Sequence, residues 1–185
     1  MNRLTLASFA WALIASQARA ADAPPPELAT LCREVFCRTP QVRLMVDAQR
    51  VYEQRMEAPL PVLLPNGWVS VYPGETVYVE AQLEGTNLKL LRAVPKPEKL
   101  ETTLELKFEQ LPAKPDMMLT VSNPFPVAVR FRMGFMRPDS DRLLRTSSCP
   151  VLGGKKLFEH WPHAIFQLVV TDPQVLAEGD DLSCK

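Results

Sequence analysis

The stretch from residue 116 to residue 136 reads Asp-Met-Met-Leu-Thr-Val-Ser, then Asn-Pro-Phe-Pro, then Val-Ala-Val-Arg-Phe-Arg-Met-Gly-Phe-Met. In its last ten residues every second side chain is large and apolar, and Arg130 and Arg132 lie among the residues between them. A period of two is typical of a β-strand with one buried face, because a helix would distribute the same residues around its circumference. The buried face is expected to consist of Val127, Val129, Phe131, Met133 and Phe135.

The two halves of this stretch cannot form a regular hairpin across residues 123–126. Such a hairpin would place Val121, on the apolar face of the first strand, opposite Ala128, on the other face of the second. Because paired residues share one face of a sheet, this register would mix buried with exposed side chains. The connection is therefore expected either to contain a bulge or to cross between two packed sheets, and we favour the crossing.

Shorter alternating runs, separated by turn residues, occupy most of the remaining chain. All 18 prolines follow residue 20, and proline is poorly tolerated inside helices and central strands, so their positions indicate turns. Many short strands predict a mainly β, antiparallel fold, which we interpret as a β-sandwich of immunoglobulin-like architecture, with a closed β-barrel as the alternative. Strands are expected at residues 42–46, 60–64, 68–72, 75–84, 88–94, 102–110, 116–122, 127–136, 143–148 and 164–170.

Two segments of this pattern need separate mention. Residues 47–57 are compatible with helix or strand, and we favour a strand that returns from 42–46. Thr171-Asp172-Pro173 is expected to end the last strand, which leaves a mostly polar tail from Gln174 to Lys185.

Residues 1–20 have the three parts of a secretory signal peptide. Arg3 provides the positive start, residues 4–15 form a short apolar run, and Ala18-Arg19-Ala20 is a small-x-small cleavage site. The apolar run is too short to span a bilayer, and no second apolar stretch follows it. We therefore expect a chain that begins at Ala21, has no transmembrane segment, and is periplasmic or secreted.

Removal of residues 1–20 would take away two arginines and no acidic residue. The 21 basic and 21 acidic residues of the full chain would become 19 and 21, a net charge of −2. This balance does not favour binding to nucleic acid. The length suits a single domain, in which a segment 21–58, with a short helix and a strand, packs on a sandwich core of residues 59–185.

All four cysteines follow the expected cleavage site, and an even number in an exported chain indicates two disulfides. Loop closure favours partners that lie close along the chain, which are Cys32 with Cys37 and Cys149 with Cys184. The first pair conflicts with the short helix, since five helical residues rise about 7.5 Å and bridged Cα atoms lie within about 7 Å. Either the helix ends before Cys37 or Cys32 has another partner, and we favour an early end. The helix is indicated by Leu28, Leu31, Cys32, Val35 and Phe36, which recur at helical spacing.

Both histidines lie in the segment Glu159-His160-Trp161-Pro162-His163. The zincin motif needs two histidines four residues apart on a helix, whereas His160 and His163 are three apart and flank a proline. We therefore expect a structural loop in which they are at most weak metal candidates, and we predict no cofactor.

No catalytic constellation is found in the sequence, because there is no nucleophile elbow and the cysteines are expected to be bridged. Arg130, Arg132 and Trp161 form a possible binding surface for an acidic partner, either an envelope protein or a polymer. The sequence therefore predicts an exported, non-catalytic binding or structural module of the bacterial cell envelope. The alternatives are a periplasmic carrier of a small ligand or copper, using His160, His163 and the methionines, and an enzyme with its site in the loop 149–163.

Overall fold

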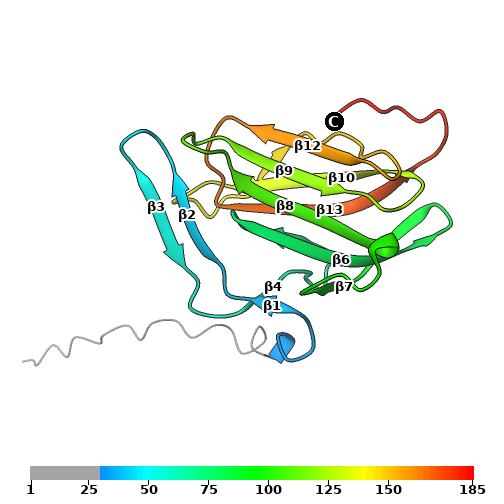
Figure 1. Cartoon of the computed structure of the whole chain (residues 1–185), viewed down its shortest axis with the longest axis horizontal. Coiled ribbons are helices and arrows are strands. Elements are labelled where there is room, and N and C mark those ends of the chain that lie inside the picture. The colour runs from blue at the N-terminus through cyan, green and yellow to red at the C-terminus, as the bar shows by residue number, and fades with distance from the viewer. Residues whose placement is uncertain (1–29) are drawn as a thin grey trace, which may run out of the picture.

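The computed structural model describes residues 30–185, and the regular secondary structure of this part of the chain consists almost entirely of antiparallel strands (Figure 1). The expected signal peptide, residues 1–20, lies outside the described residues. The only complete helical element in the described range is the 3-10 turn η1, Leu100–Thr102. The strands are β1 (Cys37–Arg38), β2 (Gln41–Met45), β3 (Val51–Arg55), β4 (Leu60–Pro61), β5 (Val69–Val71), β6 (Glu75–Glu84), β7 (Asn87–Val94), β8 (Thr103–Gln110), β9 (Met117–Ser122), β10 (Ala128–Met136), β11 (Leu144–Thr146), β12 (Lys156–Trp161) and β13 (Gln167–Leu176).

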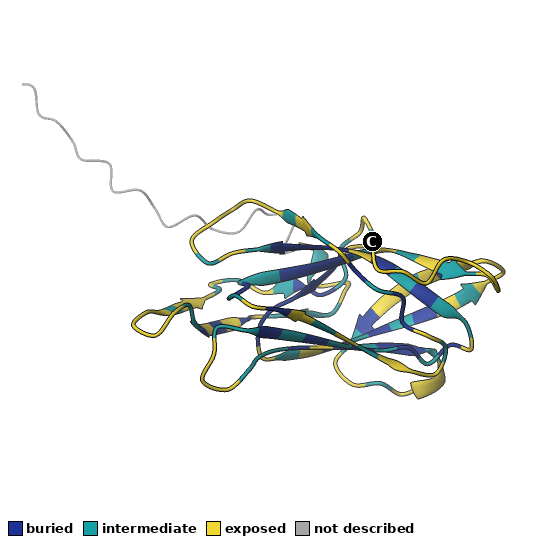
Figure 2. Ribbon diagram, turned by 90° about the horizontal axis from the view of Figure 1, so that it is seen from above, coloured by how far each residue is buried: buried dark blue, intermediate teal, exposed yellow. Residues whose placement is uncertain are grey.

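Nine of these strands form one large sheet in the order β11-β10-β13-β7-β6-β8-β9-β12, with β5 paired to β13. The prediction of a mainly β, antiparallel fold is thereby confirmed. The expected division into two separate sheets is not what the structure shows, because Asn87 of β7 pairs with Gln174 of β13 and joins both layers. The result is a single sheet that curls into a half-barrel, with buried residues on its facing layers (Figure 2).

The sheet curls without closing into the alternative β-barrel. Its terminal strands, β11 and β12, do not pair with each other in the described part of the chain. Side chains connect them instead: the indole Nε1 of Trp161 donates a hydrogen bond of 2.9 Å to the hydroxyl of Thr146. The interior is filled by the apolar faces that alternation predicts, including Leu106, Phe108 and Val129, each at most 1% exposed.

The connection between β9 and β10 crosses the molecule, as the parity of the two strands predicts. β9 pairs with β8 and β12, whereas β10 pairs with β11 and β13. Asn123, which is 2% exposed, organises the crossing. Its amide nitrogen donates to the carbonyls of Val127 (2.8 Å), Val151 (3.2 Å) and Leu152 (3.3 Å), and its oxygen accepts the N–H of Phe125 at 3.0 Å.

Of the residues expected to be helical, the described part of the chain shows only Thr30 and Leu31 as helix, and a turn follows at residues 32–34. The N–H of Arg33 bonds to the carbonyl of Thr30 at 3.1 Å, and the chain then enters β1. Cys32 and Cys37 form the disulfide that loop closure favours, with 5.5 Å between their Cα atoms. The helix ends before Cys37, as we favoured, because five helical residues would hold these cysteines too far apart.

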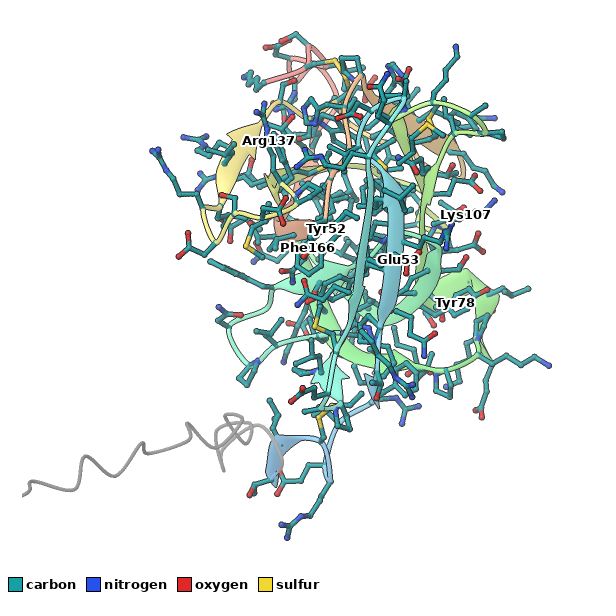
Figure 3. The ribbon with its side chains drawn as sticks, turned by 90° about the vertical axis from the view of Figure 1, so that its left-hand side faces the viewer. Tyr52, Glu53, Tyr78, Lys107, Arg137 and Phe166 are labelled. Atoms are coloured by element: carbon teal, nitrogen blue, oxygen red, sulfur yellow. A yellow bond between two sulfur atoms is a disulfide. The ribbon has the colours of Figure 1, made fainter. Side chains whose placement is uncertain are left out.

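Residues 47–57 contain a strand, β3, which pairs with β2 in a separate hairpin. The hairpin lies across one end of the curled sheet, shown facing the viewer in Figure 3. Its inner strand buries Val42 and Leu44, and its Tyr52 ring packs edge-on against Phe166 at 5.7 Å between centroids. The Gln110 side chain accepts the N–H of Met45 and donates to its carbonyl, both at 2.8 Å, which ties the hairpin to β8.

The expected end of the last strand at Thr171-Asp172-Pro173 is wrong, because β13 continues to Leu176. The three residues form an irregularity instead of a turn: Arg130 pairs with Gln174 and Arg132 with Thr171, so β13 carries one extra residue there. Asp172 has a φ of 46°, which is the backbone state that such a bulge accommodates. A proline at a bulge needs no ladder hydrogen bond, which explains how Pro173 can lie within the strand.

The side chain of Arg38, which is 15% exposed, connects the N-terminal segment to the large sheet. Its guanidinium forms two hydrogen bonds with the Glu75 carboxylate, of 3.0 and 3.1 Å. It also donates to three backbone carbonyls, those of Leu60 (3.0 Å), Pro61 (2.8 Å) and Ser70 (2.7 Å). A planar guanidinium with five donors suits such a convergent set of acceptors, which no lysine could satisfy.

Candidate functional site

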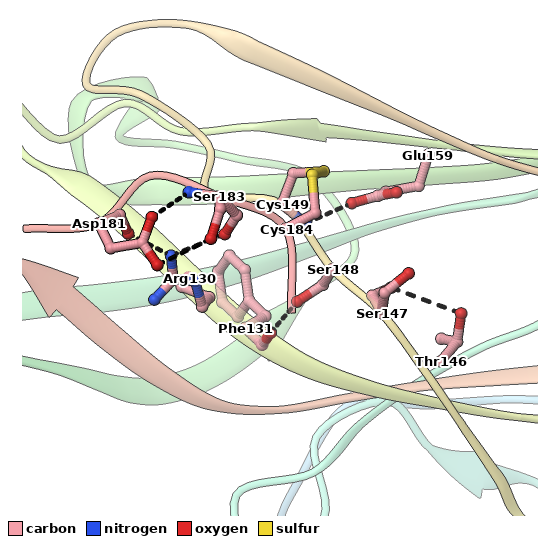
Figure 4. The surroundings of a disulfide bond; sticks show 10 residues. All are labelled: Arg130, Phe131, Thr146, Ser147, Ser148, Cys149, Glu159, Asp181, Ser183 and Cys184. Atoms are coloured by element: carbon pink, nitrogen blue, oxygen red, sulfur yellow. Dashed lines mark hydrogen bonds between the residues drawn. A yellow bond between two sulfur atoms is a disulfide. The ribbon is translucent and has the colours of Figure 1, made fainter.

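The two outward arginines of β10 are both engaged within the chain. Arg130 donates to the backbone carbonyls of Asp181 and Ser183 in the C-terminal tail (Figure 4). Arg132 forms an ion pair of 3.2 Å with Asp172, and the side chains of both residues are more than half exposed. The strand parity that places both arginines on one face is confirmed, but Arg130 holds the tail against the sheet.

Trp161 does not belong to a binding surface with these arginines, which corrects the sequence interpretation. Its side chain is 6% exposed and packs edge-on against Phe108, with 6.2 Å between ring centroids. It is the last residue of β12, so the expected loop 149–163 contains a six-residue strand. The tryptophan is core because the alternation of β12 directs Leu157, Glu159 and Trp161 inward.

The two histidines contact different groups and do not converge. His160 lies 3.0 Å from the Asp116 carboxylate, whereas the His163 ring nitrogen lies 3.2 Å from the Ala164 carbonyl, beside Phe135. Among residues 30–185, no group of three or more His, Cys, Asp or Glu side chains is arranged to hold a metal ion.

The C-terminal tail is tied to the sheet by a disulfide and by backbone pairing. Cys149 and Cys184 are bridged, and Ser148 and Lys185 exchange two backbone hydrogen bonds of 2.8 and 3.0 Å. The N–H and hydroxyl of Ser183, together with Lys185, lower the pKa of Asp181 to about 2. The tail therefore presents a charged carboxylate at any ordinary pH.

Glu159 is the most unusual acid of this region, because it lies on the inward face of β12. Its carboxylate accepts the N–H of Cys149 at 2.7 Å. Burial raises its pKa above the ordinary value of 4.5, and the hydrogen bond from Cys149 opposes this only in part. The protonated form is therefore favoured by the fold, and the ionised form is tolerated at a cost in stability.

We expect Glu159→Gln to stabilise the protein at neutral pH and to reduce the dependence of stability on pH. A carboxyl whose pKa is raised on folding contributes stability that is present below pH 4.5 and is lost as pH rises through the folded-state pKa. Glutamine retains an oxygen for the Cys149 N–H but carries no charge. The melting temperature should be measured between pH 4 and 8, with the exposed Glu178→Gln as control. Identical pH profiles for wild type and Glu159→Gln would contradict this account.

The most favourable binding geometry lies elsewhere, along β7. This strand pairs with β6 over its whole length, but on its other side only Asn87 pairs, with Gln174 of β13. Residues 88–94 therefore present an edge that pairs with no other described strand. Such an edge exposes a row of backbone N–H and C=O groups that can accept another chain.

A groove of about 510 Å³, lined mostly by residues with apolar side chains, runs beside this edge. Its opposite wall is formed by the turn that ends at Phe36 and by the segment 63–67, in which Leu63 bridges to Val69 of β5. Leu91 and Val35, at 46% and 37% exposure, show apolar surface to solvent there. The lining residues are Leu31, Glu34, Val35, Phe36, Leu63, Leu64, Pro65, Gly67, Leu90, Leu91, Arg92, Ala93 and Val94.

A bulge at Leu91 shapes the edge. The register of β6 and β7 shifts between Glu80, which pairs with Arg92, and Ala81, which pairs with Leu90, so Leu91 is the extra residue. Sequence reasoning identified the strand but missed the site. The adjacent apolar residues Leu90-Leu91, which interrupt a regular alternation, are the signal that could have indicated the bulge.

No family model, curated protein sequence or solved structure matches the chain. Among residues 30–185, no helix combines the length and hydropathy that crossing a bilayer requires. The two disulfides are typical of a protein from an oxidising compartment outside the cytoplasm. The function is therefore argued from the groove and from the strand edge beside it.

Proposed function

We propose that this protein is a non-catalytic binding module of the bacterial cell envelope, which binds an extended segment of a partner protein along β7. The observation that carries the proposal is the unpaired edge of residues 88–94 beside an apolar groove. Free backbone donors and acceptors are complementary to another polypeptide backbone, and the groove suits apolar side chains. Both features belong to recognition by addition of a β-strand.

The dimensions of the site suit a short segment of chain. Seven residues of β7 extend over about 23 Å, which is the length of one ordinary strand. Backbone hydrogen bonds to β7 would supply affinity without regard to sequence, whereas every second side chain of the partner would enter the groove. Glu34 and Arg92 are the charged residues of the lining, so the groove itself favours apolar side chains.

A second copy of this chain fits the edge poorly. If two β7 strands paired in antiparallel register about Leu90 and Leu91, Lys89 of one copy would lie opposite Arg92 of the other, and like charges directly opposite each other are destabilising. The bulge at Leu91 also disfavours regular edge-to-edge pairing. A different protein, whose strand matches this interrupted edge, is therefore favoured.

The proposal is tested by placing a photoreactive amino acid at Leu91 and, as a matched control, at the exposed Leu152 outside the groove. Irradiation in the intact envelope should cross-link one partner at position 91 and none at 152. A synthetic peptide covering the cross-linked segment should then slow hydrogen exchange of the amides in residues 88–94. Leu91→Asp should weaken its binding at least about tenfold by placing a charge in an apolar site, and Leu152→Asp should leave it unchanged.

Three results would contradict the proposal. Equal cross-linking at positions 91 and 152 would show that the groove has no specific occupant. A bound peptide that leaves exchange in β7 unaltered would exclude strand addition. Cross-linking of the chain to itself, with a dimeric mass in solution, would assign the edge to self-association.

A further inference from the structure

A second candidate site lies on the outer face of β10 and β11, away from the groove. Arg130, Arg132, Arg145 and Lys185 line a hollow of about 260 Å³, which we call the basic pocket. Its other lining residues are Phe131, Met133, Thr146, Ser148 and Gln174, so none of them is acidic.

The register of the sheet brings the arginines together. Arg145 of β11 pairs with Gly134 of β10, which lies two residues beyond Arg132 and therefore on the same face. Because Gly134 has no side chain, Leu143 covers this position: a Cβ there would lie 3.1 Å from the Leu143 side chain. Lys185 completes the set because the disulfide to Cys149 and two backbone hydrogen bonds to Ser148 hold the tail there.

Two of the four cations in the basic pocket lack an acidic partner within the described chain. Arg132 is paired with Asp172, and Lys185 with Asp181. Arg145 is exposed and forms no ion pair or side-chain hydrogen bond with described residues. Arg130 bonds only to backbone carbonyls, and its buried Nε has no hydrogen-bond partner. Guanidinium donors without acceptors favour an added anion.

An apolar hollow adjoins the basic pocket and shares Arg132, Met133 and Arg145 with it. Trp68 and Leu143 line this hollow, and they are 39% and 44% exposed. Asp172 also lines it but is paired with Arg132. Charge and apolar surface are therefore placed side by side on one face.

We infer that this face binds an anionic amphiphile. Its phosphate or carboxylate contacts Arg130 and Arg145 in the basic pocket, and its apolar part lies over Trp68 and Leu143. This inference is independent of the proposed strand addition, because β7 and its groove contribute no residue to either hollow. Either proposal can fail while the other holds.

Octyl phosphate and octanoate, below their critical micelle concentrations, are suitable probes, with inorganic phosphate as the head group alone. Titration calorimetry at low salt is expected to show saturable binding of at least one amphiphile, at least about tenfold tighter than inorganic phosphate, because the alkyl chain is buried. The emission of Trp68 should change on binding, since the only other tryptophan after residue 20, Trp161, is buried. Preference for octyl phosphate or for octanoate would identify the head group.

Arg145→Gln should weaken amphiphile binding at least about tenfold without changing the melting temperature, because Arg145 has no contact to lose. Arg137→Gln removes the same charge from an exposed arginine that lines neither hollow, and it should have no effect. Leu143→Ser should weaken the binding of octyl phosphate more than the binding of inorganic phosphate. Absence of saturable binding, or equal losses in Arg145→Gln and Arg137→Gln, would overturn the inference.

Discussion

Replacement of Arg38 by methionine is expected to lower the free energy of unfolding by about 3–5 kcal/mol, the cost of removing one partner of a buried ion pair. Methionine retains most of the side-chain volume but leaves Glu75, which is 17% exposed, without its cation. Three backbone carbonyls would also lose their donor. The loss extends to the ring of Tyr72, because the guanidinium lies 5.1 Å from its centroid. Urea denaturation at pH 7 measures the effect.

A matched control for this change is Arg43→Met. Arg43 also pairs with a glutamate, Glu53, across two strands, but their side chains are 75% and 60% exposed. Exposed pairs contribute less than about 1 kcal/mol, so the free energy of unfolding of this variant should be close to that of the wild type. Arg38→Met combined with Glu75→Gln should recover part of the lost stability, because no buried charge remains unpaired. A loss below about 1 kcal/mol for Arg38→Met would refute the assigned role.

Asn123→Ala is expected to produce the second large loss, about 2–4 kcal/mol, because two backbone groups at the crossing lose their partner. The N–H of Phe125 and the carbonyl of Val127 would have no replacement acceptor or donor among their present contacts. The Leu152 carbonyl would keep the N–H of Lys155, which it accepts at 3.1 Å. The Val151 carbonyl also accepts the N–H of Val129 and would remain satisfied. Urea denaturation again gives the magnitude.

The control for Asn123 uses the same side chain at an exposed turn. The oxygen of Asn66 accepts the N–H of Trp68 at 3.2 Å, but water can replace it there. Asn66→Ala should therefore cost less than about 1 kcal/mol. Equal losses in Asn66→Ala and Asn123→Ala would show that burial does not determine the contribution of these asparagines.

The alternation of apolar and polar residues was the most informative signal in the sequence. The period of two in β8, β9 and β10 identified which side chains are buried, because the face of a strand follows from covalent geometry alone. Parity also predicted that β9 and β10 would not pair, and the structure places them in different layers. The disulfides agreed with loop closure, since the cysteines of each pair can approach without long-range rearrangement.

The sequence predictions were wrong where interactions between different parts of the chain decide the structure. Trp161 occupied an expected loop, but pairing with Met117 in β9 extends the strand to that position and buries the ring. Pro173 resembled a strand end, yet β10 pairs on both sides of the irregularity. The helical spacing continues to Phe36, but the helix in the described residues ends at Leu31 because the Cys32–Cys37 bridge requires a tighter path.

By itself, the sequence determined the antiparallel class and the buried face of each long strand, and it favoured the cysteine pairs that formed, because these depend on neighbours along the chain. Only the tertiary structure decided that both layers form one curled sheet, joined where Asn87 meets Gln174. The same long-range pairing decides which edge stays free, so the groove beside β7 could not be read from any local pattern. The basic pocket likewise depends on Arg145 and Lys185, which reach Arg130 through strand register and a disulfide rather than through adjacency in sequence.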